Sequence, residues 1–302
     1  MYYNCSLLLA LLLITINGGC KEKQILPEND VPVKNDNSLL WKIEGKGLKE
    51  PSYLYGTMHL IPREDFVMGA HLREVLESSR TLVMEIDMDD LNPMETAMAA
   101  MLPGSTTLKD ILSESQFDSL KTYLIDTFKV SQFEFMAAQK MKPIFVSQMF
   151  LKDAIKDPVA FELEFMEIAR EKEIDITGFE TAMEQVGFFD SISMEKQIEM
   201  LMESLTQQSE AAMYDKLIEH YKKQEIDSLQ AMINEDATLL EFNGLLISNR
   251  NKNWVKKLKE MLPEGRLFIA VGAGHLPGEE GVINLLRREG YIVTPISTEK
   301  RK

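Results

Sequence analysis

The stretch FIAVGAGHLPGEE, residues 268–280, begins with an apolar run and then reads Gly-x-x-His-Leu-Pro. Its apolar residues are consecutive, as in a strand that is covered on both faces. In an open α/β sheet, ligands bind beyond the carboxyl ends of the strands, where a histidine just past such a strand would lie. The segment therefore predicts a sheet strand that carries His275 to a functional edge.

The same pattern occurs near the other end of the chain, in YLYGTMHLIPRE at residues 53–64. Here Gly56 and His59 correspond to Gly272 and His275. Each unit is followed by a helical pattern and then by another strand, so we expect two related halves of one sheet. A glycine at a strand end lets the chain turn and the backbone approach a ligand, so we expect both glycines to contact a bound cofactor.

Further strand-like runs flank these two units. They are residues 39–45, 80–87, 173–180 and 290–296. The first run is joined to the strand at 52–59 by a short loop that suits a hairpin. Apolar residues at helical spacing fill the stretches of about 92–170 and 182–262. We therefore predict an α/β fold with a central mixed sheet, built from two related halves at the N- and C-terminal ends, with long helical insertions between them.

Two acidic residues also end predicted strands: Glu85 in TLVME and Glu180 in IDITGFE. A catalytic metal usually has about three protein ligands and one open position, so two imidazoles alone are too few. We predict a metal site formed by His59, His275, Glu85 and Glu180. Glu85 could instead be a solvated residue, and Glu180 an acid that interacts with the dipole of the following helix.

The composition excludes several classes of function. The chain has 302 residues with 45% hydrophobic and 27% charged residues, typical of a globular protein. Its net charge of −15 would repel phosphate backbones, so we expect no nucleic-acid partner. There is no Gly-x-Ser-x-Gly elbow and no His-Glu-x-x-His helix. Cys5 and Cys20 are the two cysteines, and both lie in the N-terminal segment, which excludes a cysteine nucleophile.

The N-terminal segment CSLLLALLLITINGGC, residues 5–20, predicts a signal peptide over residues 1–19. Its ending resembles a lipobox, with Cys20 acylated as the first mature residue, although Asn17 stands where an aliphatic residue is usual. The alternative is an ordinary signal in which Cys20 has no role. Residues 20–37 are polar and predict a tether, and the folded domain would be residues 38–302. We therefore expect a cell-envelope protein, lipid-anchored to the outer membrane.

Several motifs resemble those of the TraB/GumN family, which includes the Tiki proteins. They are LWKIEGKGLKEPSYLYGTMHL at 40–60, RTLVMEID at 80–87, MKPIFV at 141–146, GFETAMEQ at 178–185, NRNKNW at 249–254 and VGAGHLPGEEGVINLLRREGY at 271–291. The resemblance covers nearly the whole predicted domain, with Phe179 in place of a usual leucine. It also implies a fold like that of erythromycin esterases and the haem-linked ChaN lipoproteins (EreA/ChaN-like).

The resemblance implies a metal-dependent hydrolase that acts on a peptide or small-molecule substrate, with a divalent ion such as zinc, manganese or cobalt. His59 and His275 would be metal ligands, and Glu85 a ligand or the general base. Arg250 and Asn251 would contact substrate or an oxyanion, unless they are an exposed helix pair. The alternative function is a lipoprotein whose histidines bind haem or a metal without turnover.

Overall fold

The computed structural model describes residues 37–299, apart from residues 90, 148–154, 206 and 236. The predicted signal peptide, Cys20 and nearly all of the tether lie outside the described residues. Within the described part of the chain, no helix has both the length and the apolar character needed to cross a bilayer.

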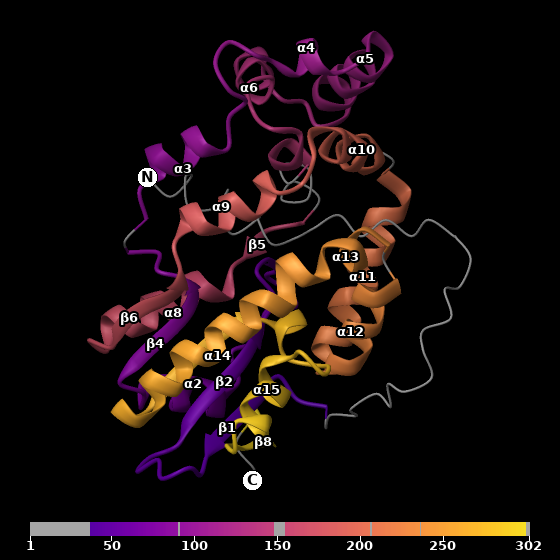
Figure 1. Ribbon diagram of the computed structural model, residues 1–302. Helices are drawn as coiled ribbons and strands as arrows, with labels where there is room; N and C mark the ends of the chain where they lie inside the picture. The colour runs from indigo at the N-terminus through magenta and orange to yellow at the C-terminus, as the bar shows by residue number, and fades with distance from the viewer. Residues whose placement is uncertain (1–36, 90, 148–154, 206, 236, 300–302) are drawn as a thin grey trace, which may run out of the picture.

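A six-stranded mixed sheet forms the centre of the molecule (Figure 1), in the order β6-β4-β7-β2-β1-β8. Its strands are β1 (Leu40–Glu44), β2 (Ser52–Thr57), β4 (Thr81–Ile86), β6 (Asp175–Glu180), β7 (Leu267–Gly272) and β8 (Ile292–Ile296). All six predicted strands are confirmed, and β1 and β2 form the expected antiparallel hairpin. A separate pair, β3 (Ile61–Pro62) with β5 (Pro158–Val159), was not predicted.

The two halves of the sheet interleave. β7 lies between β2 and β4 and is parallel to both, so the two histidine-bearing strands are direct neighbours. In the β2–β7 register, Gly56 is opposite Val271 and Thr57 is opposite Gly272. β6 extends the parallel part beyond β4, while β1 pairs antiparallel with both β2 and β8. Both Gly-x-x-His segments therefore leave the sheet side by side at one edge.

Helices cover both faces of this sheet. α14 (Asn249–Met261) and α15 (Val282–Arg288) pack together on one face, and α2 (Ala70–Glu77) and α8 (Phe161–Glu171) lie on the other (Figure 1). Their apolar sides join the strands in one core, to which β7 contributes a run of buried residues. The spacing of Phe161, Phe165 and Ile168 that predicted a helix is the buried side of α8.

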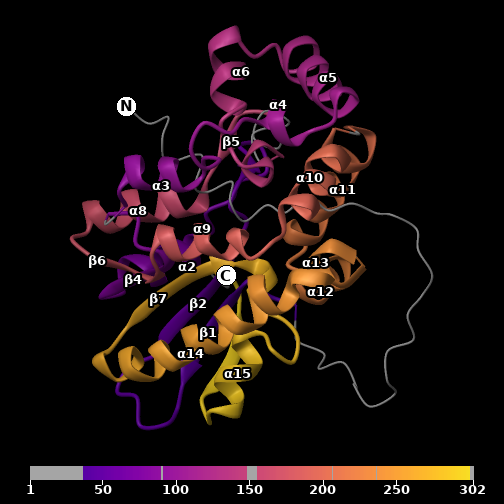
Figure 2. The same cartoon turned by 45° about the horizontal axis from the view of Figure 1, so that its top comes forward.

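The first predicted insertion, at about 92–170, divides into a helical cluster away from the sheet and a helix that packs on the sheet. Its described elements include α3 (Pro93–Ala99), α4 (Leu108–Ile111), α5 (Glu114–Thr122), the π-helix η2 (Tyr123–Thr127), α6 (Gln132–Ala138), a helical segment at 143–147, β5 and α8. The helices from α4 to α6 share a small core, centred on Leu108, Leu120 and Phe135 and completed by Leu201 from the second insertion, and they extend away from the sheet (Figure 2). α8 instead packs on the sheet, so part of this insertion belongs to the central core.

The second insertion also returns to the sheet. It comprises α9 (Ala182–Asp190), α10 (Met194–Ser204), α11 (Gln207–Lys222), α12 (Ile226–Glu235), α13 (Ala237–Asn243), the π-helix η3 (Gly244–Ser248), α14 and the short η4 (Leu262–Glu264). A cluster that includes Ile86, Val186 and Leu246 joins α9 and η3 to the end of β4. η3 runs directly into α14, and π-helical turns frequently occur at functional sites.

Candidate functional site

Three predicted site residues meet at the carboxyl edge of the parallel strands. His59 lies just past β2, Glu85 lies near the end of β4, and His275 ends the 3-10 turn η5 (Ala273–His275) after β7. All three are buried, with exposed fractions of 7%, 5% and 2%. The Nε2 atoms of His59 and His275 each lie 3.8 Å from the same oxygen, Oε1 of Glu85. Two segments more than two hundred residues apart therefore converge on one carboxylate.

The two motif glycines provide space rather than a turn, since neither has a positive φ. A β-carbon at Gly272 would lie 3.0 Å from His59 Nε2 and 3.3 Å from Glu85 Oε1. A β-carbon at Gly56 would lie 2.4 Å from Leu276 Cδ1, in the turn after β7. Gly272 borders the site and lies where it could contact a bound cofactor. Gly56 instead packs against Leu276 and Ala273.

A glutamate that the sequence did not indicate fixes the orientation of His59. Nδ1 of His59 lies 2.8 Å from Oε1 of Glu162, on α8. The same oxygen accepts a 2.6 Å hydrogen bond from the Thr57 hydroxyl. Because a carboxylate only accepts, His59 carries a proton on Nδ1, and in the neutral ring its Nε2 lone pair faces Glu85.

An amide performs the corresponding task for His275. Nδ1 of His275 lies 2.7 Å from Oδ1 of Asn251, on α14. The amide nitrogen of Asn251 donates to the backbone oxygens of His275 and Glu280, at 3.2 and 2.8 Å. These two bonds leave Oδ1 as the acceptor, so the His275 proton is on Nδ1. Asn251 was predicted to contact substrate, and in the structure its amide binds His275 and the backbone of Glu280.

Arg250 lies at the centre of the cluster and is 2% exposed, so it is not part of an exposed helix pair. Its NH2 group donates to Glu85 Oε2 at 2.6 Å and to Glu180 Oε2 at 2.7 Å. Its NH1 group donates to the Leu246 backbone oxygen at 3.1 Å and lies 3.3 Å from Nε2 of His275. The guanidinium therefore connects two strand-end carboxylates to one of the histidines.

Glu180 has little capacity left to bind a metal. Besides Arg250, its oxygens accept from Trp254 Nε1 at 2.8 Å and from Gln185 Nε2 at 3.0 Å. These bonds together with the guanidinium occupy the roughly four acceptor positions of a carboxylate. The structure thus pairs this predicted ligand with Arg250. Trp254 also packs against the imidazole of His275, with 4.4 Å between the two ring centroids.

The electrostatic environment distinguishes the two histidines. Burial lowers the pKa of His275 to about 3, and Arg250 and His59 add to this effect against the opposing influence of Glu85. Burial also acts to lower the pKa of His59, but Glu162 and then Glu85 outweigh it and raise that pKa above its usual value. His275 is therefore neutral, with an Nε2 lone pair that faces the NH1 group of Arg250, while His59 is the more basic imidazole.

Glu85 is an anion at any physiological pH. Burial alone would raise the pKa of its carboxyl group, but Arg250, the two imidazoles and the Gly272 N–H together lower it to about 2. The Gly272 N–H donates to Oε1 at 2.7 Å. The solvated alternative for Glu85 is therefore excluded by its burial and its partners.

The chain is also similar to known proteins. The model of the TraB/PrgY/gumN family matches residues 39–295. The chain belongs to the TraB/PrgY/gumN family. No solved structure is significantly similar to it.

Several curated relatives in this group are named as metalloproteases. The chain is 24% identical to the Metalloprotease TIKI homolog of Nematostella vectensis, with 90% of this chain and 70% of the relative covered. It is 27% identical to Metalloprotease TIKI1 of Homo sapiens, with 85% and 61% covered. It is also 22% identical to Uncharacterized protein YbaP of Escherichia coli (strain K12), with 78% and 87% covered. Part of each TIKI protein thus lies outside the match.

These names imply a metal, and the donor atoms at the site suit one. Among the described residues, no His, Cys, Asp or Glu side chains are already gathered as a metal cluster. The Nε2 atoms of His59 and His275 nevertheless both lie near Glu85 Oε1, and that of His275 also faces Arg250 NH1. Each Nε2 atom lies 3.8 Å from Glu85 Oε1. Two ligand atoms around a tetrahedral ion with bonds of 2.0–2.1 Å lie only about 0.5 Å closer together than this.

The charge balance of the buried cluster also suits a divalent cation. With both imidazoles neutral, the carboxylates of Glu85, Glu162 and Glu180 contribute three negative charges and Arg250 contributes one positive charge, which leaves −3 + 1 = −2. Each of these side chains is at most 9% exposed. An uncompensated buried charge is costly, so this net negative cluster favours a bound cation.

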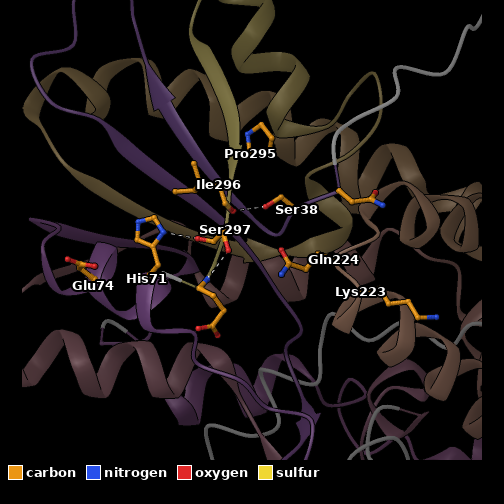
Figure 3. A pocket seen from close by; sticks show the side chains of 10 residues that line it. Ser38, His71, Glu74, Lys223, Gln224, Pro295, Ile296 and Ser297 are labelled. Carbon is orange, nitrogen blue, oxygen red and sulfur yellow. Dashed lines mark hydrogen bonds between the residues drawn. The ribbon is translucent and has the colours of Figure 1, made fainter. Parts of the chain in front are cut away.

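A separate cavity at the same edge of the sheet shares no residue with this cluster. It has a volume of about 970 Å³ and lies between the end of β8 and the start of α2 (Figure 3). There the His71 ring donates to the Ser297 backbone oxygen, and Ser38 donates to that of Ile296. The His71 bond fastens α2 to the chain after β8, which is a structural role for His71, and the Ser38 bond joins the start of β1 to the end of β8.

Proposed function

We propose that this chain is a metal-dependent hydrolase that acts on peptides. The observation that carries the proposal is the convergence of two oriented imidazoles on Glu85 Oε1, with both Nδ1 atoms bound to acceptors. Histidine ligands of metals almost always donate their other ring N–H in this manner. The relationship to the TIKI metalloproteases supports the same reaction class.

His59 and His275, through Nε2, and Glu85, through Oε1, would hold the ion. A bound divalent metal lowers the pKa of a water molecule and polarises a carbonyl group. For Glu85, a pKa of about 2 favours the role of ligand, since a general base works best with a pKa near the operating pH. Glu180 would keep Arg250 in place.

Arg250 would stabilise negative charge that develops on the substrate. Four of its donor hydrogens point at carboxylate or backbone oxygens. The remaining NH1 hydrogen faces His275 Nε2, at the border of the site. Donors that are already oriented toward a developing oxyanion are a major source of catalysis.

The haem-binding alternative receives less support from this arrangement. A porphyrin between the two imidazoles would have to displace Glu85, which is bonded to Arg250 and to the Gly272 N–H. Displacing that carboxylate would leave the buried guanidinium short of a partner, which is costly.

The proposal includes a lipid anchor on Cys20 and a location in the cell envelope, which rest on the sequence of residues 1–37. Replacing Cys20 with Ser should move the protein from the membrane fraction to the soluble fraction and remove its acyl label. Unchanged membrane association of this variant would contradict the anchor and leave the hydrolase proposal untouched.

The hydrolase proposal is tested by metal analysis of the purified protein together with cleavage of a peptide library in zinc, manganese or cobalt. Glu85→Gln should lower both metal affinity and turnover, whereas Glu279→Gln, at an exposed glutamate, should change neither. If the variant at Glu85 keeps its metal while turnover falls by roughly two to four orders of magnitude, Glu85 is the general base. A wild-type protein that binds none of these ions and cleaves no peptide would refute the proposal.

A further inference from the structure

Glu162 is a buried acid that none of the predicted motifs contains. It is the second residue of α8 and is 7% exposed. One oxygen, Oε1, accepts from both Thr57 and His59, while Oε2 is buried without a hydrogen-bond partner among the described residues. A buried carboxylate with one unpaired oxygen is costly, so a structural role alone explains Glu162 poorly.

α8 holds this carboxylate firmly against the end of β2. Phe161 and Phe165, on either side of Glu162 in sequence, are 1% and 0% exposed. Both rings pack against Tyr55 of β2, with centroid distances of 5.8 and 5.7 Å. The N-terminal end of a helix also stabilises an anion. The position of Glu162 over the strand that carries His59 is therefore set by the core.

The corresponding position beside His275 could not carry a charge in the same way. Asn251 accepts from His275 Nδ1 while its amide nitrogen donates to two backbone oxygens. An aspartate there would lose both donations and would face those oxygens with a negative charge. The charge that makes an imidazole electron-rich is therefore available only on the His59 side.

We infer that Glu162 is a positioning residue that fixes His59 as an Nε2 donor and makes it the stronger of the two histidine ligands. This inference rests on the proposed metal-dependent function. Glu162 acts through the Nδ1–H of His59 rather than through contact with substrate. Such outer partners of ligand histidines typically contribute a factor of 10–100 to metal affinity.

The test compares Glu162→Ala and Glu162→Gln with Glu167→Ala and Glu167→Gln, which change an exposed glutamate on the same helix. Metal affinity is measured by calorimetry with zinc, manganese and cobalt ions. Glu162→Ala should bind about 10–100-fold more weakly than wild type. Glu162→Gln keeps an acceptor but loses the charge, so its metal affinity should lie between that of Glu162→Ala and that of wild type. Both Glu167 variants should bind as wild type does.

A second readout needs no metal. The chain has only four histidines, so ¹⁵N spectra of the imidazoles can be assigned with a His59→Gln variant. At alkaline pH, where the imidazoles are neutral, the metal-free wild type and Glu162→Gln should show His59 protonated on Nδ1, and Glu162→Ala should lose this preference. Circular dichroism establishes that each variant is folded.

The two readouts separate this inference from the proposed function. If wild type binds no divalent ion, the hydrolase proposal fails, while an Nδ1 proton that depends on Glu162 still supports the positioning role. If Glu162→Ala binds metal within twofold of wild type, or keeps the Nδ1 preference of His59, the inference is overturned.

Discussion

The two Gly-x-x-His units have nearly the same sequence but different surroundings. Both histidines follow neighbouring parallel strands, and both Nε2 atoms lie 3.8 Å from Glu85 Oε1. The Nδ1 of His59, however, meets the carboxylate of Glu162 on α8, whereas that of His275 meets the amide of Asn251 on α14. The strand halves are thus similar at the sheet edge and differ in the helix that supports each histidine.

The difference shows how the helical insertions contribute to the site. One insertion supplies a charged partner and the other a neutral partner together with Arg250. The result is one imidazole with a raised pKa beside one with a pKa of about 3. A sheet edge with two equivalent histidines becomes an asymmetric centre because the supporting helices differ.

The largest expected effect comes from removing either histidine. His59→Ala and His275→Ala should each lose metal binding in calorimetry and reduce peptide cleavage to background, because two protein ligands are too few to hold a catalytic ion. His71→Ala, on α2, serves as the control and should retain both properties. Full-rate cleavage by both site variants would show that the two units do not share one centre.

Arg250→Met should be the most destabilising change in the cluster. It removes the cation from between Glu85 and Glu180, and breaking a buried ion pair in this way costs about 3–5 kcal/mol. Arg288→Met, at a half-exposed arginine with distant acidic partners, should cost less than about 1 kcal/mol. Urea unfolding of both variants measures the difference, and equal midpoints would contradict a central role for the guanidinium.

Asn251→Asp gives the His275 side a carboxylate and so attempts to copy the His59 side. The backbone oxygens of His275 and Glu280 would lose their donor, which should cost about 2–4 kcal/mol. The unfolding free energy of this variant should therefore fall while its secondary structure is retained. An unchanged or increased stability would mean that the two supports are interchangeable.

The glycines should show the smallest changes in stability. Gly56→Ala and Gly272→Ala should each cost about 1–3 kcal/mol, because each added methyl group overpacks the contact between the two units. Only Gly272→Ala should also weaken metal binding strongly, since its methyl group would lie against His59 Nε2. Gly187→Ala, with open space around it in α9, should be neutral or stabilising by up to about 1 kcal/mol. Thermal unfolding and calorimetry measure both properties.

Local sequence patterns were sufficient to predict the strands and the ends from which His59, Glu85, Glu180 and His275 extend. An apolar run, a glycine and a following polar residue are close in sequence, and strand ends of a parallel sheet meet at one edge. These patterns could not show that β7 inserts between β2 and β4, which brings the two histidines together.

Long-range packing decided the rest of the site. The sequence around Glu162 predicts a helix with an apolar side but gives no sign of a site residue. The contact of Glu162 with His59 depends on how Phe161 and Phe165 pack against β2. Asn251 could be recognised as a site residue from its motif, yet its bond to His275 depends on α14 packing on the sheet. The residues that the sequence identified hold the reactive positions. The partners that orient and charge them come from distant helices, because a hydrogen bond depends on spatial proximity and not on spacing along the chain.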